Sequence, residues 1–249
     1  MSFIKNPKEI ELMRASGEIA ARILQEVASS VEPGKTTVEL DNYARELIEK
    51  NGVKPAFLNY QGFPGVMCTS VNDVVVHGAP SNTKLNEGDI LSLDFGVIYK
   101  DWYSDTAITM PVGEVSHEAK RIMSVTKRAL RLGINKAKIG ATTGDIGNTI
   151  QRFVEREGYS VVRELVGHGI GKNLHEEPNV PNYGSRKSGE QLREGMVIAI
   201  EPMVVAGEPI LKLDNDGFGY KTQDNSLTAH FEHTVAITKN GGVVLTESK

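Results

Sequence analysis

Four carboxylates stand among apolar residues at positions typical of β-strands, where an acidic side chain without a partner is costly to bury. They are Asp94, Asp105, Glu201 and Glu232. Any one of them alone would be taken to face solvent, but four that converge in a low-dielectric centre would raise one another's pKa. Two divalent cations would balance the four negative charges, and a bridging hydroxide would leave the site at about −1. The pattern therefore predicts a centre with two divalent metal ions.

Three histidines lie next to a glycine or within a glycine-rich stretch, where the backbone can approach a cleft closely. His168 and His175 belong to the glycine-rich stretch 166–178, which is too irregular for a regular helix. His77 precedes Gly78 at the end of the apolar run 74–76. We expect the backbone at these positions to deliver imidazoles to a cleft.

The other three histidines differ from these. His117 follows a polar segment and has the pattern of an ordinary surface residue. Strand parity turns His233 away from the face that carries Glu232, because successive side chains of a strand point to opposite faces. For His230 the pattern leaves the role open.

The donor types narrow the choice of metal. Carboxylates and an imidazole without thiolate suit manganese, iron, cobalt, zinc or magnesium rather than copper or an iron–sulfur cluster. The single cysteine, Cys68, is a weak candidate nucleophile, since a lone cysteine is more often a small buried apolar residue.

Two helices and a repeat organise the chain. Apolar periodicity predicts helices over 8–27 and about 37–50, the second opened by a capping box of Thr36 and Glu39. Residues 34–52 resemble residues 140–158, and residues 87–94 resemble residues 194–201. We interpret this as a duplicated module of helices and strands, in one domain (1–249) with halves of about 8–113 and 114–249.

Strands follow the helices in each half. Alternating apolar residues predict strands over 90–99 and 102–110, which carry Asp94 and Asp105. In the second half, Glu201 follows the apolar run that begins at Val197, and Glu232 shares a strand face with His230. The acids of the two halves therefore occupy related strand positions.

Composition excludes several classes of protein. The 249 residues include 28 lysines and arginines and 32 acidic residues, a net charge of −4, which gives no electrostatic footprint for DNA or an anionic membrane. One cysteine excludes an internal disulfide. No apolar run approaches the ~20 residues of a membrane span, and no secretory signal opens the chain. We expect a soluble, cytoplasmic protein.

The five residues of the expected centre, in chain order, resemble the dinuclear site of the methionine aminopeptidases. The order is Asp94, Asp105, His168, Glu201 and Glu232, and the surrounding segments 70–78, 103–106, 167–171, 200–203 and 231–234 agree. The resemblance covers nearly the whole chain. The short segment between His175 and Glu201, and the absence of an N-terminal zinc-binding extension, resemble the bacterial type I form. It implies an α+β pita-bread fold with pseudo-twofold symmetry, in which helices cover a central antiparallel sheet.

The resemblance also implies how two metal ions are held. Asp105, His168, Glu201 and Glu232 would hold one ion, and Asp94, Asp105 and Glu232 the other, with cobalt, manganese, iron, zinc or nickel as the metal. Glu201 would act as general base towards the bridging water, and the second ion would hold the free α-amine of the substrate.

Further site residues follow from the same resemblance. His175 would polarise the scissile carbonyl, and His77 would contact the leaving nitrogen. A sodium or potassium ion would lie at Asn72, Val74 and Thr228. The methionine pocket would be lined by six residues that simple core packing would explain about as well: Phe57, Tyr60, Phe63, Cys68, Leu174 and Phe218.

The implied activity is removal of N-terminal methionine from nascent polypeptides whose second residue is small, by a monomer that contacts the ribosome transiently. An Xaa-Pro aminopeptidase of the same fold is one alternative, although such enzymes usually carry an extra N-terminal domain for which this chain leaves no room. The second alternative is a non-catalytic binding protein on the same scaffold. Such a protein would be recognised by the loss of metal-ligand residues.

Overall fold

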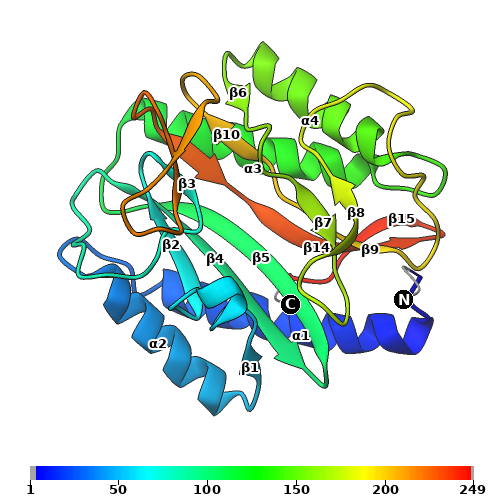
Figure 1. Ribbon diagram of the computed structural model, residues 1–249, viewed down its shortest axis with the longest axis horizontal. Helices are drawn as coiled ribbons and strands as arrows, with labels where there is room; N and C mark the ends of the chain where they lie inside the picture. The colour runs from blue at the N-terminus through cyan, green and yellow to red at the C-terminus, as the bar shows by residue number, and fades with distance from the viewer. Residues whose placement is uncertain (1–3, 248–249) are drawn as a thin grey trace.

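A curled antiparallel sheet forms the centre of the molecule, and two pairs of helices flank it. The computed structural model describes residues 4–247. In Figure 1, α1 and α2 (blue) run along the lower side of the sheet, and α3 and α4 (green) along its upper side. The expected α+β architecture, with helices covering a central antiparallel sheet, is confirmed.

The helices and strands follow one another in two similar series. The helices are α1 (Pro7–Ala28), α2 (Thr37–Lys50), η1 (Tyr60–Gly62, 3-10), α3 (His117–Lys136) and α4 (Thr143–Arg156). The strands are β1 (Lys54–Pro55), β2 (Met67–Val71), β3 (Val74–Val76), β4 (Ile90–Tyr99), β5 (Trp102–Pro111), β6 (Ser160–Val161), β7 (Gly167–Gly169), β8 (Glu176–Val180), β9 (Val197–Ile200), β10 (Met203–Val205), β11 (Leu211–Leu213), β12 (Tyr220–Thr222), β13 (Thr228–His230), β14 (Glu232–Thr238) and β15 (Gly241–Val244).

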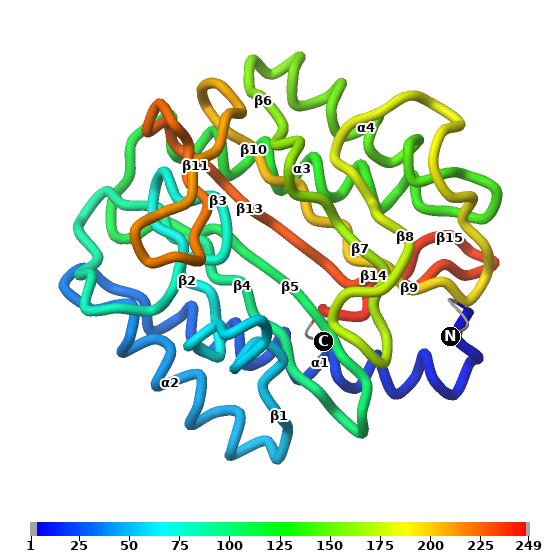
Figure 2. Tube along the Cα trace, in the orientation of Figure 1, coloured from blue at the N-terminus to red at the C-terminus, as the bar shows by residue number. Residues whose placement is uncertain are grey.

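The main sheet joins the two halves of the chain. Its strand order is β1-β4-β5-β14-β9-β7-β8, with β2 paired to β4 and β15 to β14. The halves meet where β5 pairs with β14. Two smaller sheets, β13-β10-β6 and β11-β12-β3, lie beside it. In the second of these, β12 pairs with β3 although the two are far apart in the sequence, and Figure 2 shows this late part of the chain (orange) beside β3 (cyan).

Local signals at the helix ends explain where the helices begin. Asn6 caps α1, while Thr36 with Glu39 and Thr142 with Asp145 form capping boxes at the starts of α2 and α4. Each cap satisfies backbone N–H groups that have no partner within the helix. The helices predicted over 8–27 and about 37–50, and the strands predicted over 90–99 and 102–110, are confirmed.

The backbone itself repeats the predicted duplication. Thr36 forms an isolated bridge with Lys84, and Thr142 forms the equivalent bridge with Gln191. The amide of Gly34 donates to the Leu85 carbonyl, just as the amide of Gly140 donates to Leu192. These pairs differ by the same offset as the sequence repeat. These equivalent contacts agree with a duplicated helix-and-strand module, and the division into two halves stays a prediction.

Each half has its own hydrophobic core between its helices and the sheet. In the first half the buried cluster includes Ile23, Leu40, Leu47, Leu91 and Phe95. In the second half it includes Ile122, Leu130, Ile146, Ile150 and Ile198. The helices thus bury one face of each half-sheet, and the other face is left for the site described below.

Gly17 lets α1 lie directly against the chain that follows β15. A Cβ at this position would overlap the carbonyl oxygen of Leu245 and crowd Thr246. The Thr246 hydroxyl in turn accepts a hydrogen bond from the amide of Thr234 on β14. Gly17 is therefore required where α1 supports the strand that carries Glu232.

We expect Gly17→Ala to lower the free energy of unfolding by about 1–3 kcal/mol, because the backbone must move to admit the methyl group. Urea denaturation measures this change. Gln25→Ala, at an exposed position of the same helix, is the matched control and should change stability little. Equal stability of the Gly17→Ala protein would contradict the close contact.

Candidate metal centre and substrate cavity

Strand register brings the acidic residues of the two halves together. Asp94 on β4 lies opposite Ala107 on β5, and Ala107 lies opposite Glu232 on β14. Asp105 is two residues from Ala107 and so points to the same face. The small alanine between Asp94 and Glu232 leaves room for the three carboxylates to face one another.

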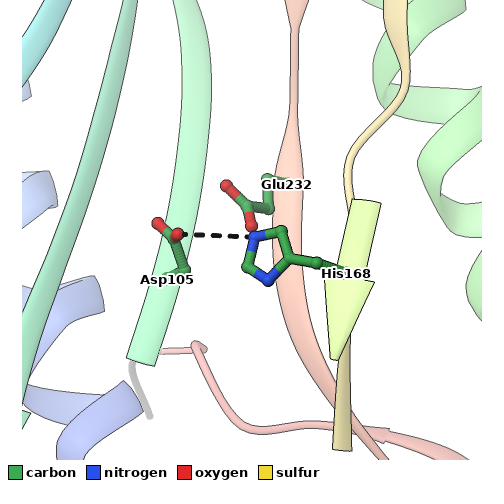
Figure 3. Close-up of side chains that lie close together, drawn as sticks. All are labelled: Asp105, His168 and Glu232. Atoms are coloured by element: carbon green, nitrogen blue, oxygen red, sulfur yellow. Dashed lines mark ion pairs between the residues drawn. The ribbon is translucent and has the colours of Figure 1, made fainter. Parts of the chain in front are cut away.

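His168 enters the same cluster from β7. Its flanking glycines have no space for a side chain, because a Cβ at Gly167 or Gly169 would collide with carbonyl oxygens of the neighbouring strands. The ligand-type atoms of Asp105, His168 and Glu232 all lie within 4.8 Å of one another. Figure 3 shows these three side chains converging from three different strands.

A backbone hydrogen bond sets the orientation of the His168 ring. Nδ1 lies 2.9 Å from the carbonyl oxygen of Gly169, which can only accept, so Nδ1 carries the proton. Nε2 then keeps its lone pair and points to the acids, 3.9 Å from Asp105 and 3.6 Å from Glu201. This is the tautomer a metal-binding imidazole needs, held as metal ligands commonly are.

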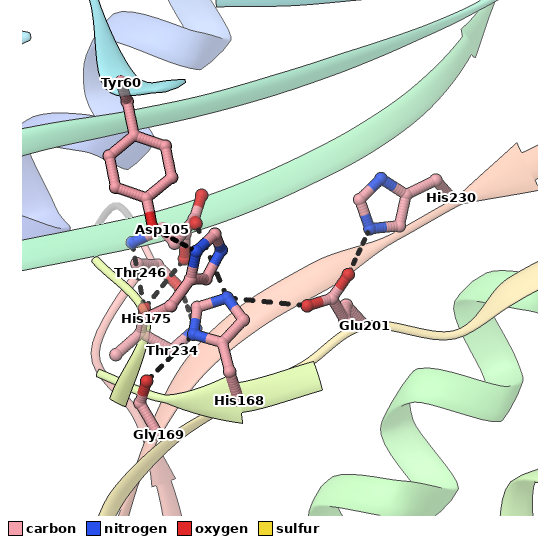
Figure 4. Close-up of polar contacts among 9 residues, drawn as sticks. All are labelled: Tyr60, Asp105, His168, Gly169, His175, Glu201, His230, Thr234 and Thr246. Atoms are coloured by element: carbon pink, nitrogen blue, oxygen red, sulfur yellow. Dashed lines mark hydrogen bonds and ion pairs between the residues drawn. The ribbon is translucent and has the colours of Figure 1, made fainter. Parts of the chain in front are cut away.

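Glu201 follows directly after β9 and closes the cluster. Its carbonyl oxygen accepts a hydrogen bond from Asn182, and its carboxylate lies between two imidazoles. Oε1 is 3.6 Å from Nε2 of His168, and Oε2 is 3.6 Å from Nε2 of His230 (Figure 4).

Burial changes the protonation of these groups. It raises the pKa of the Asp105 carboxyl to about 7 and, with mutual repulsion, raises the pKa of Asp94, Glu201 and Glu232 well above their usual range. The same burial lowers the pKa of His168 to about 3, which keeps its imidazole neutral.

The residues present fit divalent cations. Among the residues that the structure describes, Oδ1 of Asp94, Oδ1 of Asp105 and Oε1 of Glu232 are buried without a hydrogen-bond partner. Buried carboxylate oxygens without donors are costly, and a cation satisfies them directly. Oxygen donors with one neutral imidazole suit a hard or borderline divalent metal.

A cavity of about 750 Å³ opens over the cluster. Every predicted residue of the metal centre and of the methionine pocket lines it, together with His77 and His175. Phe63 packs edge-on against Phe218 with ring centroids 5.5 Å apart. The lining also includes Met203 and Tyr220, which the sequence did not indicate, because β10 and β12 are too short to show a pattern.

The side chains of Tyr60 and His175 are joined by a hydrogen bond. The phenol oxygen lies 2.7 Å from Nδ1 of the imidazole, and the rings meet edge-on (Figure 4). His175 also stacks edge-on against His168, with centroids 4.2 Å apart. His77 also lines the cavity and meets the Tyr220 ring edge-on, and its loss of solvent lowers its pKa to about 4.

An ion pair stabilises the loop that carries His175. The Glu176 carboxylate accepts hydrogen bonds from the amides of Lys172 and Asn173 and from Nζ of Lys5, 2.8 Å away. Lys5 is buried, so the pair is protected from solvent. The loop therefore has a defined path from β7 to β8.

The three residues expected to hold a monovalent cation lie together. The Thr228 hydroxyl is 3.1 Å from the carbonyl oxygen of Asn72 and 3.0 Å from that of Val74. Asn72 has a positive φ of 52°, which turns its carbonyl towards Thr228. The geometry gathers the oxygen atoms, while the presence of an ion stays a prediction.

Comparison with known proteins identifies the family to which the chain belongs. A model of metallopeptidase family M24 matches residues 11–239. The methionine aminopeptidase of Clostridium acetobutylicum is 47% identical over 247 residues, which cover 99% of each chain. The chain belongs to the methionine aminopeptidases of metallopeptidase family M24. The predicted resemblance to this family is thereby confirmed, and the protein is a metal-dependent exopeptidase.

Solved structures of the family share the whole fold. The methionine aminopeptidase of Rickettsia prowazekii superposes with a TM-score of 0.96 at 42% identity, covering 98% of this chain and 99% of that one. The prolidase of Pyrococcus horikoshii is more distant, with a TM-score of 0.81 and 26% identity, and this chain spans 64% of it. The pita-bread fold expected from the sequence is confirmed.

We expect metal binding near pH 7 to release protons, because the buried carboxyls hold protons that a cation displaces. A raised folded-state pKa favours folding at low pH, and for Asp105 this contribution disappears as the pH rises through about 7. The metal-free protein should therefore lose stability as the pH rises from 6.5 through about 7. Calorimetric metal titration in buffers of different ionisation enthalpy measures the protons.

The pH window matters because the buried histidines act in the opposite direction. Because the pKa of His168 is lowered on folding, its contribution to the free energy of unfolding is fully present above pH 6.5 and is lost as the pH falls towards about 3. Only above pH 6.5 does the change in stability with pH come from the carboxyls alone. Saturation with Mn²⁺ is the control and should remove the loss of stability. Metal uptake at pH 7 without proton release would contradict the description of the cluster.

Proposed function

We propose that the protein removes the N-terminal methionine from newly made polypeptides whose second residue is small. The observation that carries this proposal is the buried cluster of carboxylates and His168, which lines the same cavity as the apolar residues of the expected methionine pocket. Full-length similarity to curated methionine aminopeptidases supports the substrate.

We propose two ions in the cluster. Asp105, His168, Glu201 and Glu232 would hold one, and Asp94, Asp105 and Glu232 the other, so that two carboxylates are shared. Cobalt, manganese, iron, zinc and nickel all suit these donors. When bound, the ions supply Lewis-acid chemistry that lowers the pKa of water and of the surrounding carboxyls.

The protein's own groups then have distinct tasks. Glu201 accepts the proton of the attacking water as general base, since its carboxylate stands at the edge of the cluster. Nδ1 of His175 lies 2.7 Å from the Tyr60 hydroxyl. With this hydroxyl as the donor, Nε2 of His175 would carry the proton and could donate to the developing oxyanion. His77, kept neutral by its loss of solvent, contacts the leaving nitrogen.

The apolar lining selects the first side chain of the substrate. Phe57, Phe63, Cys68, Leu174 and Phe218, with Tyr60, offer a soft surface that suits an unbranched thioether. Burial and the charge of Asp94 raise the pKa of the Cys68 thiol well above its usual range. Cys68 therefore acts as an apolar wall and not as a nucleophile.

The setting of the reaction is part of the proposal. A cytoplasmic monomer, one domain with halves of about 8–113 and 114–249, would act on chains as they leave the ribosome. An internal duplication supports a monomer, because the two modules already face each other within one chain. Along residues 4–247 no helix is long and apolar enough to cross a membrane. A sodium or potassium ion at Asn72, Val74 and Thr228 would stabilise β3 against β13.

Turnover of short peptides tests the proposal. Metal-loaded protein should cleave Met-Gly-Met and leave Xaa-Pro peptides almost uncut, whereas faster cleavage of the proline peptides would favour the prolidase-like alternative. Asp94→Asn and His168→Ala should each lower kcat/KM by more than the roughly 10–100-fold typical of residues behind the ligands. Inactivity on every methionyl peptide would favour a binding protein.

We expect Tyr60→Phe to lower kcat about fivefold to tenfold with little change in stability, because the variant loses the hydrogen bond that sets the His175 tautomer. Steady-state kinetics on Met-Gly-Met measure the effect. Tyr183→Phe removes a phenol outside the cavity and is the control. If both variants keep full kcat, the Tyr60–His175 bond has no part in the reaction.

A further inference from the structure

His230 is a buried imidazole that the proposed reaction does not use. It ends β13, directly before the strand that carries Glu232, and only 1% of its surface is exposed. Within residues 4–247, neither ring nitrogen has a hydrogen-bond partner. Buried polar groups are nearly always paired, so an orphaned imidazole beside an active site calls for an explanation.

The ring is directed at Glu201. Its Nε2 lies 3.6 Å from Oε2 of the carboxylate, and Oε1 of the same group lies 3.6 Å from Nε2 of His168. Figure 4 shows the Glu201 carboxylate between the two imidazoles, each reached by a different oxygen. A shift of a few tenths of an ångström would turn the His230 contact into a hydrogen bond.

The backbone of His230 is fixed, so this direction is built into the sheet. Its amide donates to the hydroxyl of Thr109 at 2.8 Å, and that hydroxyl lies 2.7 Å from its carbonyl oxygen. On the other side, His230 pairs with Met203 of β10, two residues after Glu201. The same short stretch of chain therefore carries Glu201 and supports the ring that faces it.

We propose that His230 is a positioning residue, whose neutral ring donates its Nε2 proton to Oε2 of Glu201. The hydrogen bond holds Oε1 on the His168 side of the cluster, where a metal ion needs it, and fixes the carboxylate that acts as base. This inference rests on the proposed function for the role of Glu201, but not for the hydrogen bond itself.

A neighbouring histidine provides a matched control. His233 lies three residues further along, with its ring turned to the opposite side of the sheet, where Nδ1 is 3.0 Å from the Thr246 hydroxyl. Over residues 4–247, no hydrogen bond or ion pair joins the side chain of His233 to a residue of the metal cluster. Loss of an imidazole from β14 can therefore be separated from loss of the contact with Glu201.

Three variants test the role. His230→Leu removes the donor, His230→Gln keeps an N–H donor on a similar side chain, and His233→Leu is the control. His230→Leu should lower kcat on Met-Gly-Met and weaken calorimetric Mn²⁺ affinity, each by about tenfold, with KM changed less than about twofold. His230→Gln should recover most of both losses. His233→Leu should lower stability only.

Equal losses in His233→Leu, or full kcat and Mn²⁺ affinity in His230→Leu, would overturn the proposal. Imidazole ¹⁵N spectra of the unaltered protein give a test that needs no folded leucine variant, with the His230 signal assigned from its absence in His230→Gln. Protonation at Nε2 is expected, and protonation at Nδ1 would overturn the hydrogen bond. If the protein cleaves no methionyl peptide, the proposed function fails, while the Mn²⁺ affinities and spectra still decide this inference.

Discussion

Burial of four carboxylates on one face of a sheet is the constraint on which the rest of the structure depends. Acidic side chains are rarely buried without partners, because the loss of solvation and the mutual repulsion of their charges both oppose ionisation. Here the acids come from β4, β5, β14 and the residue after β9, so both halves of the chain must be folded before they meet. The cluster therefore needs strands from the first and the second part of the chain together.

Small residues make this convergence possible. Ala107 separates Asp94 from Glu232 across three neighbouring strands, and the glycines on each side of His168 let β7 approach its neighbours closely. A larger side chain at Ala107 would enter the space in which the acids face one another, and a side chain at either glycine would overlap carbonyl oxygens of the neighbouring strands. Outside the cluster, helices cover the opposite face of the sheet, and Gly17 lets α1 support β14 through the segment at Leu245.

Much of this arrangement could be predicted from the sequence, for identifiable reasons. The Thr36 capping box and the alternation over 90–99 are local signals, so the predicted boundaries of α2 and β4 agree with the structure. The duplication related Asp94 to Glu201 before any strand pairing was known. His230 could not be assigned, because β13 ends there and Phe231 interrupts the alternation, so parity alone did not fix its direction. Tyr220 and Met203 come from three-residue strands, too short to show a pattern, and each strand pairs with a distant part of the chain: β12 with β3 and β10 with β13.

The same burial lowers the pKa of the imidazole and raises the pKa of the carboxyls, and both shifts favour a divalent cation in the cluster. Loss of solvent keeps the pKa of His168 near 3, so its lone pair is free at any pH at which the enzyme would work. It also raises the pKa of the carboxyls, which then hold protons unless a stronger positive charge replaces them. A divalent cation satisfies both at once, since it accepts the imidazole lone pair and favours the ionised acids. A proton neutralises only one acid at a time, and it leaves the lone pair of the neutral imidazole without a partner.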